Sequence, residues 1–252
     1  MNAATVLIEQ AAYGNRWRRV SPAAKGSLAL AGLLAAFVAA TPTAAALVAL
    51  LLALTTVLGA RVPAGVYLRV AAPAVGFLAL GSLSLLVAVG TDTAGHLSWG
   101  LAPDAGPRIA TVAGRSLASL TALLLLVLTT PLPDLIGLLR YLRVPEVLLD
   151  LMVLCYRMLF VLAAAVRDTL TAQSARLGYA SLRHGWRSLG LLVANLTVQI
   201  WQRAQALHRA ALARNGGGPL RFLSPGFANA GRDTLLAAVA GAALIVLAAG
   251  LG

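Results

Sequence analysis

Thirty-five consecutive residues without a charge follow Lys25 in this chain and read GSLALAGLLAAFVAATPTAAALVALLLALTTVLGA, residues 26–60. As a single helix this stretch would be roughly 52 Å long, whereas the hydrocarbon core of a bilayer is about 30 Å thick. Thr41-Pro42-Thr43 lies in its middle, and proline interrupts a helix. We therefore expect two short membrane-spanning helices, near 26–41 and 43–60.

The composition of the whole chain indicates the same class. Of its 252 residues 60% are hydrophobic and only 11% are charged, and the mean hydropathy is +0.85. Soluble domains carry about 25% charged residues, and disordered chains have low hydrophobicity. An ordinary soluble enzyme and a disordered chain are therefore excluded, and we expect an all-α integral membrane protein.

Three further apolar stretches are long enough to span a bilayer. They lie near 66–91, 109–130 and 233–251, and the polar loop 92–108 separates the first two. Pro73 and several glycines interrupt the stretch 66–91, which membrane helices tolerate. The expected bundle thus has about five transmembrane helices.

Basic residues exceed acidic ones by 20 to 8, and all but Lys25 are arginines. In a soluble protein this excess would point to nucleic acid, but in an apolar chain it is typical of the positive-inside bias of cytoplasmic segments. That bias predicts a cytoplasmic N-terminus in a cell membrane and an external loop 92–108. Residues 131–232, with 12 Arg and 4 acidic residues, are then cytoplasmic. We expect no nucleic-acid partner.

These counts predict three parts. Residues 1–130 form an N-terminal membrane bundle of four spans, residues 131–232 form long cytoplasmic amphipathic helices, and residues 233–252 form a C-terminal transmembrane helix. The apolar stretch 144–169 is the difficult segment, because four of its charges share one stripe of a helix: Glu146, Asp150, Arg157 and Asp168. Since charges at the bilayer centre are costly, we favour a helix under or against the membrane bundle, with its apolar majority buried in protein. A sixth span with its polar stripe facing the bundle is the alternative.

Two short segments place Ala-Arg at an expected helix end, just before a glycine. They are Ala175-Arg176-Leu177-Gly178 and Ala213-Arg214-Asn215-Gly216. A small residue admits a partner backbone, and the arginine beside it offers a bidentate bond to a carboxylate. Such ends would fit grooves of a soluble partner. The alternative is an arginine that only caps its own helix carbonyls.

The sequence holds no recognisable catalytic or metal-binding arrangement. It lacks a Walker A motif, and its three histidines, His96, His184 and His208, are far apart. We expect no catalytic residues, no cofactor and no metal site in this chain. The single cysteine, Cys155, lies in an apolar run and is expected to be a buried structural thiol.

Three stretches resemble the transmembrane T component of energy-coupling factor (ECF) transporters, in its CbiQ-like branch for cobalt or nickel. The first is Tyr13-Gly14-Asn15-Arg16-Trp17 with Pro22-Ala23-Ala24-Lys25. The second is Leu128-Thr129-Thr130-Pro131 with Leu142-Arg143-Val144-Pro145-Glu146 and Tyr156-Arg157. The third is the pair of Ala-Arg segments, which is similar to the paired Ala-Arg-Gly motifs of the family. These elements extend from about residue 12 to 216.

The resemblance implies an L-shaped protein without catalytic activity, in which a membrane bundle carries cytoplasmic coupling helices. It implies that the two Ala-Arg segments dock into two ABC ATPases. It also implies contact with a separate substrate-binding membrane protein, to which ATP-driven motion is transmitted. The third motif position departs from the family, because Leu177 and Asn215 stand where glycine is expected and Gly178 and Gly216 follow one residue later.

Other functions remain open on the sequence alone. A T component for a vitamin would share the architecture. A stand-alone transporter would place substrate or proton groups inside its spans, and the uncharged spans near 26–60 argue against it. A membrane-embedded enzyme, such as a lipid-modifying transferase, would need acidic or histidine clusters at the membrane face, which are not evident.

Overall fold

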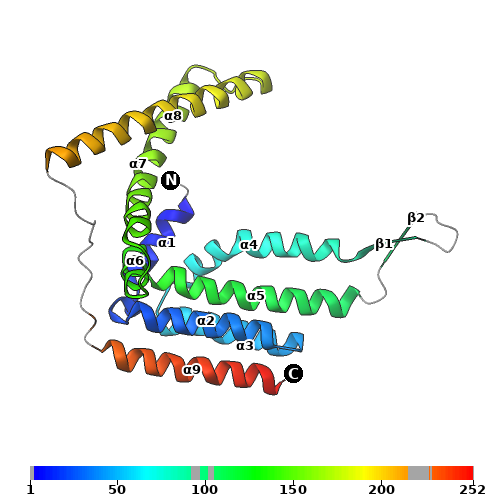
Figure 1. Cartoon of the computed structure of the whole chain (residues 1–252). Helices are drawn as coiled ribbons and strands as arrows, with labels where there is room; N and C mark the ends of the chain where they lie inside the picture. Colours follow the sequence, from blue (N-terminus) through cyan, green and yellow to red (C-terminus); the bar gives the residue numbers. More distant parts are fainter. Residues whose placement is uncertain (1–2, 92–96, 102–104, 215–226, 228, 252) are drawn as a thin grey trace. The chain divides into compact units, whose positions relative to one another are not determined.

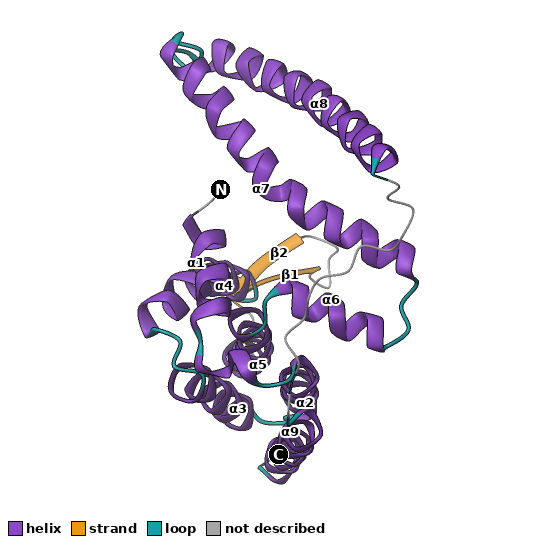
Figure 2. Cartoon of the chain, turned by 90° about the vertical axis from the view of Figure 1, so that its left-hand side faces the viewer, coloured by secondary structure: helices purple, strands orange, loops and turns teal. Residues whose placement is uncertain are grey.

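The computed structural model describes residues 3–91, 97–101, 105–214, 227 and 229–251, and nearly all of them are helical (Figures 1 and 2). The first five helical elements are α1 (Ala3–Gly14), the short turn η1 (Arg16–Arg19), α2 (Pro22–Val38), α3 (Pro42–Leu54) with its π-helical extension η2 (Thr55–Gly59), and α4 (Ala64–Ser84). After a two-stranded ribbon follow α5 (Ala105–Thr129), α6 (Leu132–Tyr141), α7 (Glu146–Ala175), α8 (Leu182–Ala213) and α9 (Ala230–Gly250).

The expected all-α integral membrane class is confirmed. Among the described residues, five helices are long and apolar enough to cross a membrane: Pro42–Gly59, α4, α5, α7 and α9. Four of them coincide with expected spans. The expected first span is α2, an apolar helix of 17 residues, and the fifth candidate is α7, which the sequence analysis assigned to the cytoplasmic part.

Two of the helix starts explain why the uncharged stretch 26–60 divides as it does. Ser21 precedes α2 and Thr41 precedes α3, and each hydroxyl accepts a hydrogen bond from the backbone N–H three residues on, at 3.2 and 3.3 Å. A proline follows each of these caps as the first helical residue. Proline there loses no helical hydrogen bond, so the two sites act as matched helix starts.

The expectation for residues 66–91 is wrong at its C-terminal end. Helix α4 stops at Ser84, and the chain continues as β1 (Val87–Thr91), which pairs antiparallel with β2 (Leu97–Leu101). The sequence Val-Ala-Val-Gly-Thr has three β-branched residues, which favour a strand. The rest of the expected external loop, at 92–96 and 102–104, lies outside the described residues.

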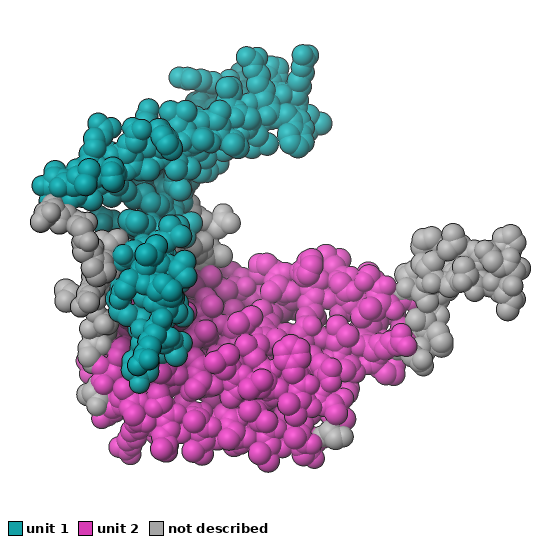
Figure 3. Space-filling view, viewed as in Figure 1, with its two compact units in different colours: residues 1–2, 136–223 teal, residues 3–135, 224–252 magenta. Residues whose placement is uncertain are grey.

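The chain divides into two compact units, coloured separately in Figure 3. One unit, here the bundle unit, holds Ala3–Leu135 and Ser224–Gly252, and the other, the α7–α8 unit, holds Ile136–Leu223. The boundary falls within α6, so the chain passes from one unit to the other along that helix.

In the bundle unit α2, α3, α5 and α9 pack side by side around a core made mostly of alanine and leucine. Small residues set the spacing, as is usual where helices approach closely in membranes. A Cβ atom on Gly241 of α9 would lie 2.5 Å from the Cβ of Ala31 in α2, so only glycine fits there.

The α7–α8 unit leaves most of its apolar side chains exposed. In α7 only Leu149, Val153 and Ala165 are buried, although the helix has 30 residues. The α7–α8 unit by itself therefore does not bury the apolar majority of residues 144–169, and burial of these residues against other protein stays a prediction. Two long helices joined at a corner enclose little volume, which explains why so few of these side chains are buried within the unit.

Candidate functional site

Two side chains from the N-terminal segment cap the C-terminus of α5. The Lys25 Nζ donates a hydrogen bond to the carbonyl oxygen of Thr129 over 2.9 Å. The Asn15 Nδ2 lies 3.2 Å from the same oxygen and 3.4 Å from that of Leu128. The last carbonyls of a helix lack intrahelical partners and carry partial negative charge. Lys25 is only 1% exposed, so its ammonium satisfies a buried helix end.

The start of α6 is held by a third residue from the same segment. Arg18 forms an ion pair with Asp134, whose side chain is only 3% exposed, while that of Arg18 is 28% exposed. Asp134 also lies in the first turn of α6, where the helix dipole favours an anion. We call Asn15, Arg18, Lys25, Thr129 and Asp134 the N-terminal clamp, because together they fix the turn between α5 and α6.

A charged bridge spans the break between α6 and α7. The Arg140 guanidinium donates from Nε and Nη2 to the Glu146 carboxylate over 3.1–3.2 Å. Arg143 adopts a left-handed conformation with φ of 61°, and the Val144 N–H donates to the Leu139 carbonyl over 3.2 Å. This left-handed helix cap and the bridge form the break between α6 and α7, just before Pro145.

The first Ala-Arg segment closes α7 with the same left-handed cap. Arg176 is the C-cap residue, and Leu177 has a φ of 56°. The Leu177 N–H donates to the Ser174 carbonyl over 3.1 Å and the Gly178 N–H to the Gln173 carbonyl over 2.9 Å. The third motif position is thus the left-handed residue of the cap, where glycine is normally preferred. Leu177 occupies that conformation despite its Cβ atom.

Side-chain hydrogen bonds hold α7 and α8 together at this corner. The Ser188 Oγ donates to the Gly178 carbonyl over 2.8 Å, and the Gln173 Nε2 donates to the Ser188 carbonyl over 2.9 Å. The Tyr179 hydroxyl donates to the Gln173 Oε1 over 2.7 Å. A Cβ on Gly178 would lie 2.7 Å from the Ser188 Oγ and 2.9 Å from the Gln173 carbonyl oxygen, so glycine is required at this position.

The outer side of this corner is free to meet a partner. Ala175, Arg176 and Leu177 are exposed, Leu177 to 74%. Among the described residues, no acceptor hydrogen-bonds the Arg176 guanidinium. The arginine therefore does not cap the carbonyls of its own helix. Trp186, 75% exposed, adds apolar surface to the start of α8.

The second Ala-Arg segment ends α8 in a similar way. Ala213 is the last helical residue, and the N–H of Arg214, the C-cap residue, donates to the Ala211 carbonyl over 3.1 Å. Both residues are exposed. Asn215 and Gly216 lie outside the described residues. The first segment ends α7 next to the start of α8 and the second ends α8, so the two are separated by about the length of α8, which with 32 residues is about 48 Å.

Among the described residues, no group of three or more His, Cys, Asp or Glu side chains could hold a metal ion. The expectation of a buried thiol is wrong, because Cys155 is exposed on α7. Cys155 is thus exposed like other apolar side chains of α7, which the α7–α8 unit leaves uncovered.

Sequence reasoning missed the clamp. It used the basic residues only to predict the orientation of the chain in the membrane. The missed signal was the spacing of polar groups around two helix ends. Asn15 and Lys25 face a helix that ends at Thr129, and Arg18 faces a helix that starts before Asp134.

These features define a class: a predominantly helical, multi-pass membrane protein in which exposed arginines follow the last residues of two long helices, α7 and α8. Residues 14–222 match the family model CbiQ, described as cobalt transport protein. The chain therefore belongs to the CbiQ family of cobalt transport proteins, and the resemblance to CbiQ-like T components is confirmed.

Individual relatives agree. The chain is 37% identical over 218 residues to the cobalt transport protein CbiQ of Rhodobacter capsulatus, covering 86% of this chain and 87% of that one. It is 31% identical over 208 residues to the cobalt transport protein CbiQ of Salmonella typhimurium, covering 79% and 92%. A putative fused cobalt transport protein CbiMQ of Methanocorpusculum labreanum is 33% identical over 98 residues, which are 39% of this chain and 16% of that one.

Proposed function

We propose that this chain is the energy-coupling subunit of an ECF-type ABC importer for cobalt. In this role it binds two ABC ATPases and a separate substrate-binding membrane protein, and it passes ATP-driven motion from the former to the latter. Family membership supports the cobalt substrate, and the fused CbiMQ relative supports a second membrane component beside this one. ATP hydrolysis takes place in the partners, so the chain itself is not an enzyme.

The observation that carries the proposal is the pair of exposed Ala-Arg helix ends. Each consists of an alanine at the last helical position and an arginine at the C-cap. A separation of about 48 Å suits two copies of one soluble partner, because each end reaches a different copy. We assign Ala175, Arg176, Leu177 and Gly178 to one ATPase, and Ala213, Arg214, Asn215 and Gly216 to the other.

The hydrogen bonds of the α7–α8 corner support a mechanical role. A docking end transmits displacement only if it does not yield locally, and Gln173, Gly178, Tyr179 and Ser188 brace the first end. Along the chain, α6 connects this unit to the bundle unit. The Arg140–Glu146 bridge stiffens the far end of α6, and the N-terminal clamp fixes its start.

The membrane arrangement follows from the charges. We place the protein in the cell membrane with its N-terminus and residues 131–232 in the cytoplasm, where the ATPases are. On this reading α7 lies at the cytoplasmic side, and partners cover the apolar side chains that the α7–α8 unit leaves exposed. Residues 1–130 and 233–252 provide the membrane bundle.

The direct test is a pull-down of the tagged chain from detergent-solubilised membranes, with the partners identified by mass spectrometry. The proposal predicts recovery of an ABC ATPase and a second membrane protein, and cobalt uptake that depends on all three. A solitary membrane protein, under conditions that keep other such complexes intact, contradicts it and favours a stand-alone transporter or enzyme. A partner that binds a vitamin contradicts the assigned substrate.

A further inference from the structure

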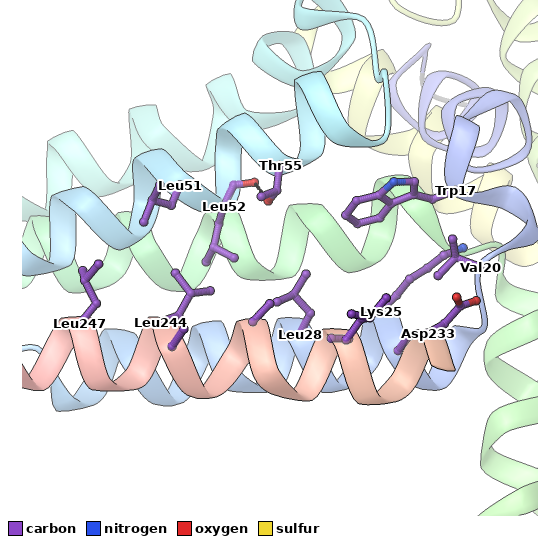
Figure 4. A pocket seen from close by; sticks show the side chains of 15 residues that line it. Trp17, Val20, Lys25, Leu28, Leu51, Leu52, Thr55, Asp233, Leu244 and Leu247 are labelled. Carbon is purple, nitrogen blue, oxygen red and sulfur yellow. Dashed lines mark hydrogen bonds between the residues drawn. The ribbon is translucent and has the colours of Figure 1, made fainter. Parts of the chain in front are cut away.

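An apolar groove runs along α9 in the bundle unit, between α9 and α3, with α2 beside it. Its volume is about 590 Å³. Figure 4 shows Leu244 and Leu247 of α9 facing Leu51 and Leu52 of α3 across the groove. The α9 residues that line it recur every three or four positions along one helical face: Asp233, Leu236, Ala237, Ala240, Ala243, Leu244 and Leu247.

The charged lining residues lie at one end of the groove only. Trp17, Lys25 and Asp233 lie there in Figure 4, and the other end is lined by leucines and alanines. Three exposed arginines adjoin the lining residues at this end. Arg16 precedes Trp17, Arg19 precedes Val20 and Arg232 precedes Asp233. These three exposed arginines are next in sequence to lining residues, and they outnumber the single carboxylate, Asp233, among the lining residues.

The dimensions fit a hydrocarbon chain, whereas a whole helix is wider than the groove. From Asp233 to Leu247 the groove extends about 21 Å along α9. A volume of 590 Å³ over that length gives a mean cross-section of roughly 28 Å². A helix with its side chains is about 10–12 Å wide and would need more than about 1,600 Å³ over the same length. One leaflet of the hydrocarbon core is about 15 Å thick, so one acyl chain spans it within the groove.

We propose that this groove binds one acyl chain of an anionic phospholipid, whose phosphate group lies against Arg16, Arg19 and Arg232. Planar guanidinium groups bind phosphate in two-pronged fashion. Juxtamembrane arginines attract the anionic lipids of the cytoplasmic leaflet. The Lys25 ammonium is engaged by Thr129, so Lys25 contributes its aliphatic stem to the groove rather than a phosphate contact.

Lipid retention provides the first test. The full chain is purified in mild detergent after exchange into a mixture of phosphatidylcholine and phosphatidylglycerol, and retained lipids are counted by native mass spectrometry. We expect one tightly retained phosphatidylglycerol per chain. Ala240→Phe fills the groove and should abolish its retention, whereas Val239→Phe, on an exposed part of α9 outside the groove, should leave it unchanged.

A separate variant tests whether the arginines at the polar end of the groove select the anionic lipid. Replacing Arg16 and Arg19 by Gln should lower the preference for phosphatidylglycerol over phosphatidylcholine at least tenfold, while the control Arg209→Gln on α8 should not. Equal retention by Ala240→Phe and the unaltered chain overturns the proposal, as does equal retention of the two lipids by the unaltered chain. Loss of a co-purifying membrane protein from Ala240→Phe, with lipid retention intact, overturns it in favour of a protein occupant.

A second measurement does not depend on the folding of any groove-filling variant. Trp17 lines the polar end, so lipids brominated near the top of their chains should quench its fluorescence. The contribution of Trp17 is the difference in fluorescence quenching between the unaltered chain and Trp17→Phe, both measured in vesicles. Stronger quenching by brominated phosphatidylglycerol than by brominated phosphatidylcholine is expected. Equal quenching by the two lipids contradicts the proposed site.

Discussion

The ammonium of Lys25 lies 2.9 Å from the carbonyl oxygen of Thr129, across 104 residues of sequence. Asn15 donates to the same oxygen, so two N-terminal side chains share one acceptor at the end of α5. Both partners belong to stretches that carry the resemblance to the family. The contact gives a physical reason why these stretches occur together, because the N-terminal stretch supplies the donors for the carbonyl at the end of α5.

Shared capping predicts a non-additive loss of stability. We expect Lys25→Met and Asn15→Leu each to cost about 1 kcal/mol, since the other donor still satisfies Thr129. The double variant should cost about 3 kcal/mol or more, because buried carbonyls are then left without a donor. Denaturant titration of the purified chain in micelles measures these values. Arg16→Met, which removes an exposed cation, is the control, and strictly additive losses would contradict shared capping.

The ion pair at the start of α6 predicts a large effect of a single charge. Removing one partner of a buried pair costs about 3–5 kcal/mol. Because the Arg18 side chain is 28% exposed, we expect Arg18→Gln to cost about 3 kcal/mol, at the lower end of that range. Arg18→Gln with Asp134→Asn should cost less than the sum of the two single changes, as the same titration would show. Arg19→Gln, on an exposed neighbour, should change stability by no more than about 0.5 kcal/mol.

The left-handed conformation of Leu177 predicts that replacing this residue by glycine stabilises the α7–α8 corner. A left-handed conformation costs an L-residue about 1–2 kcal/mol, and glycine avoids this cost. Leu177→Gly should therefore stabilise the α7–α8 corner by about 1 kcal/mol and slow hydrogen exchange of the Gly178 amide about fivefold. Leu182→Gly, at the first residue of α8, should instead speed exchange there. Faster exchange in Leu177→Gly would show that the side chain of Leu177 stabilises the corner.

Cys155 reports whether α7 crosses the membrane. It is the only cysteine of the chain and is exposed on α7. If residues 131–232 are cytoplasmic, a membrane-impermeant maleimide should label Cys155 in inside-out vesicles and not in right-side-out vesicles. In vesicles that hold the chain without its transporter partners, labelling in neither orientation, with full labelling after detergent is added, would place Cys155 in the hydrocarbon core and make α7 a span.

The sequence predicted the elements that depend on local signals. Proline and a hydroxyl cap at Thr41 divide the uncharged stretch, and an amphipathic helix ending near Arg214 follows from its apolar spacing. The strand β1 was missed, because its apolar residues also suit the end of a membrane helix. In each of these places a few consecutive side chains determine the secondary structure.

The clamp and the corner could not be predicted in the same way, because they depend on contacts between distant residues. Nothing local to Lys25 indicates a buried ammonium, and Asn15 looks like an ordinary turn residue. The role of Leu177 depends on its left-handed backbone conformation. A sequence indicates this conformation when glycine occupies the position, but not when leucine does. Periodicity identified α7 as a helix, but charges alone did not decide what covers its apolar side chains.

The most direct test of the coupling role is the binding of ATPases to the chain with Arg176→Glu, Arg214→Glu or both. Charge reversal at a docked arginine should cost about 2–5 kcal/mol of binding, so each single change should weaken co-purification of the ATPases and the double change should abolish it. Arg209→Glu, an exposed position within α8, is the matched control and should retain them. Full recovery of ATPases by the double variant, in a chain that is still inserted in the membrane, would contradict the assignment of both docking ends.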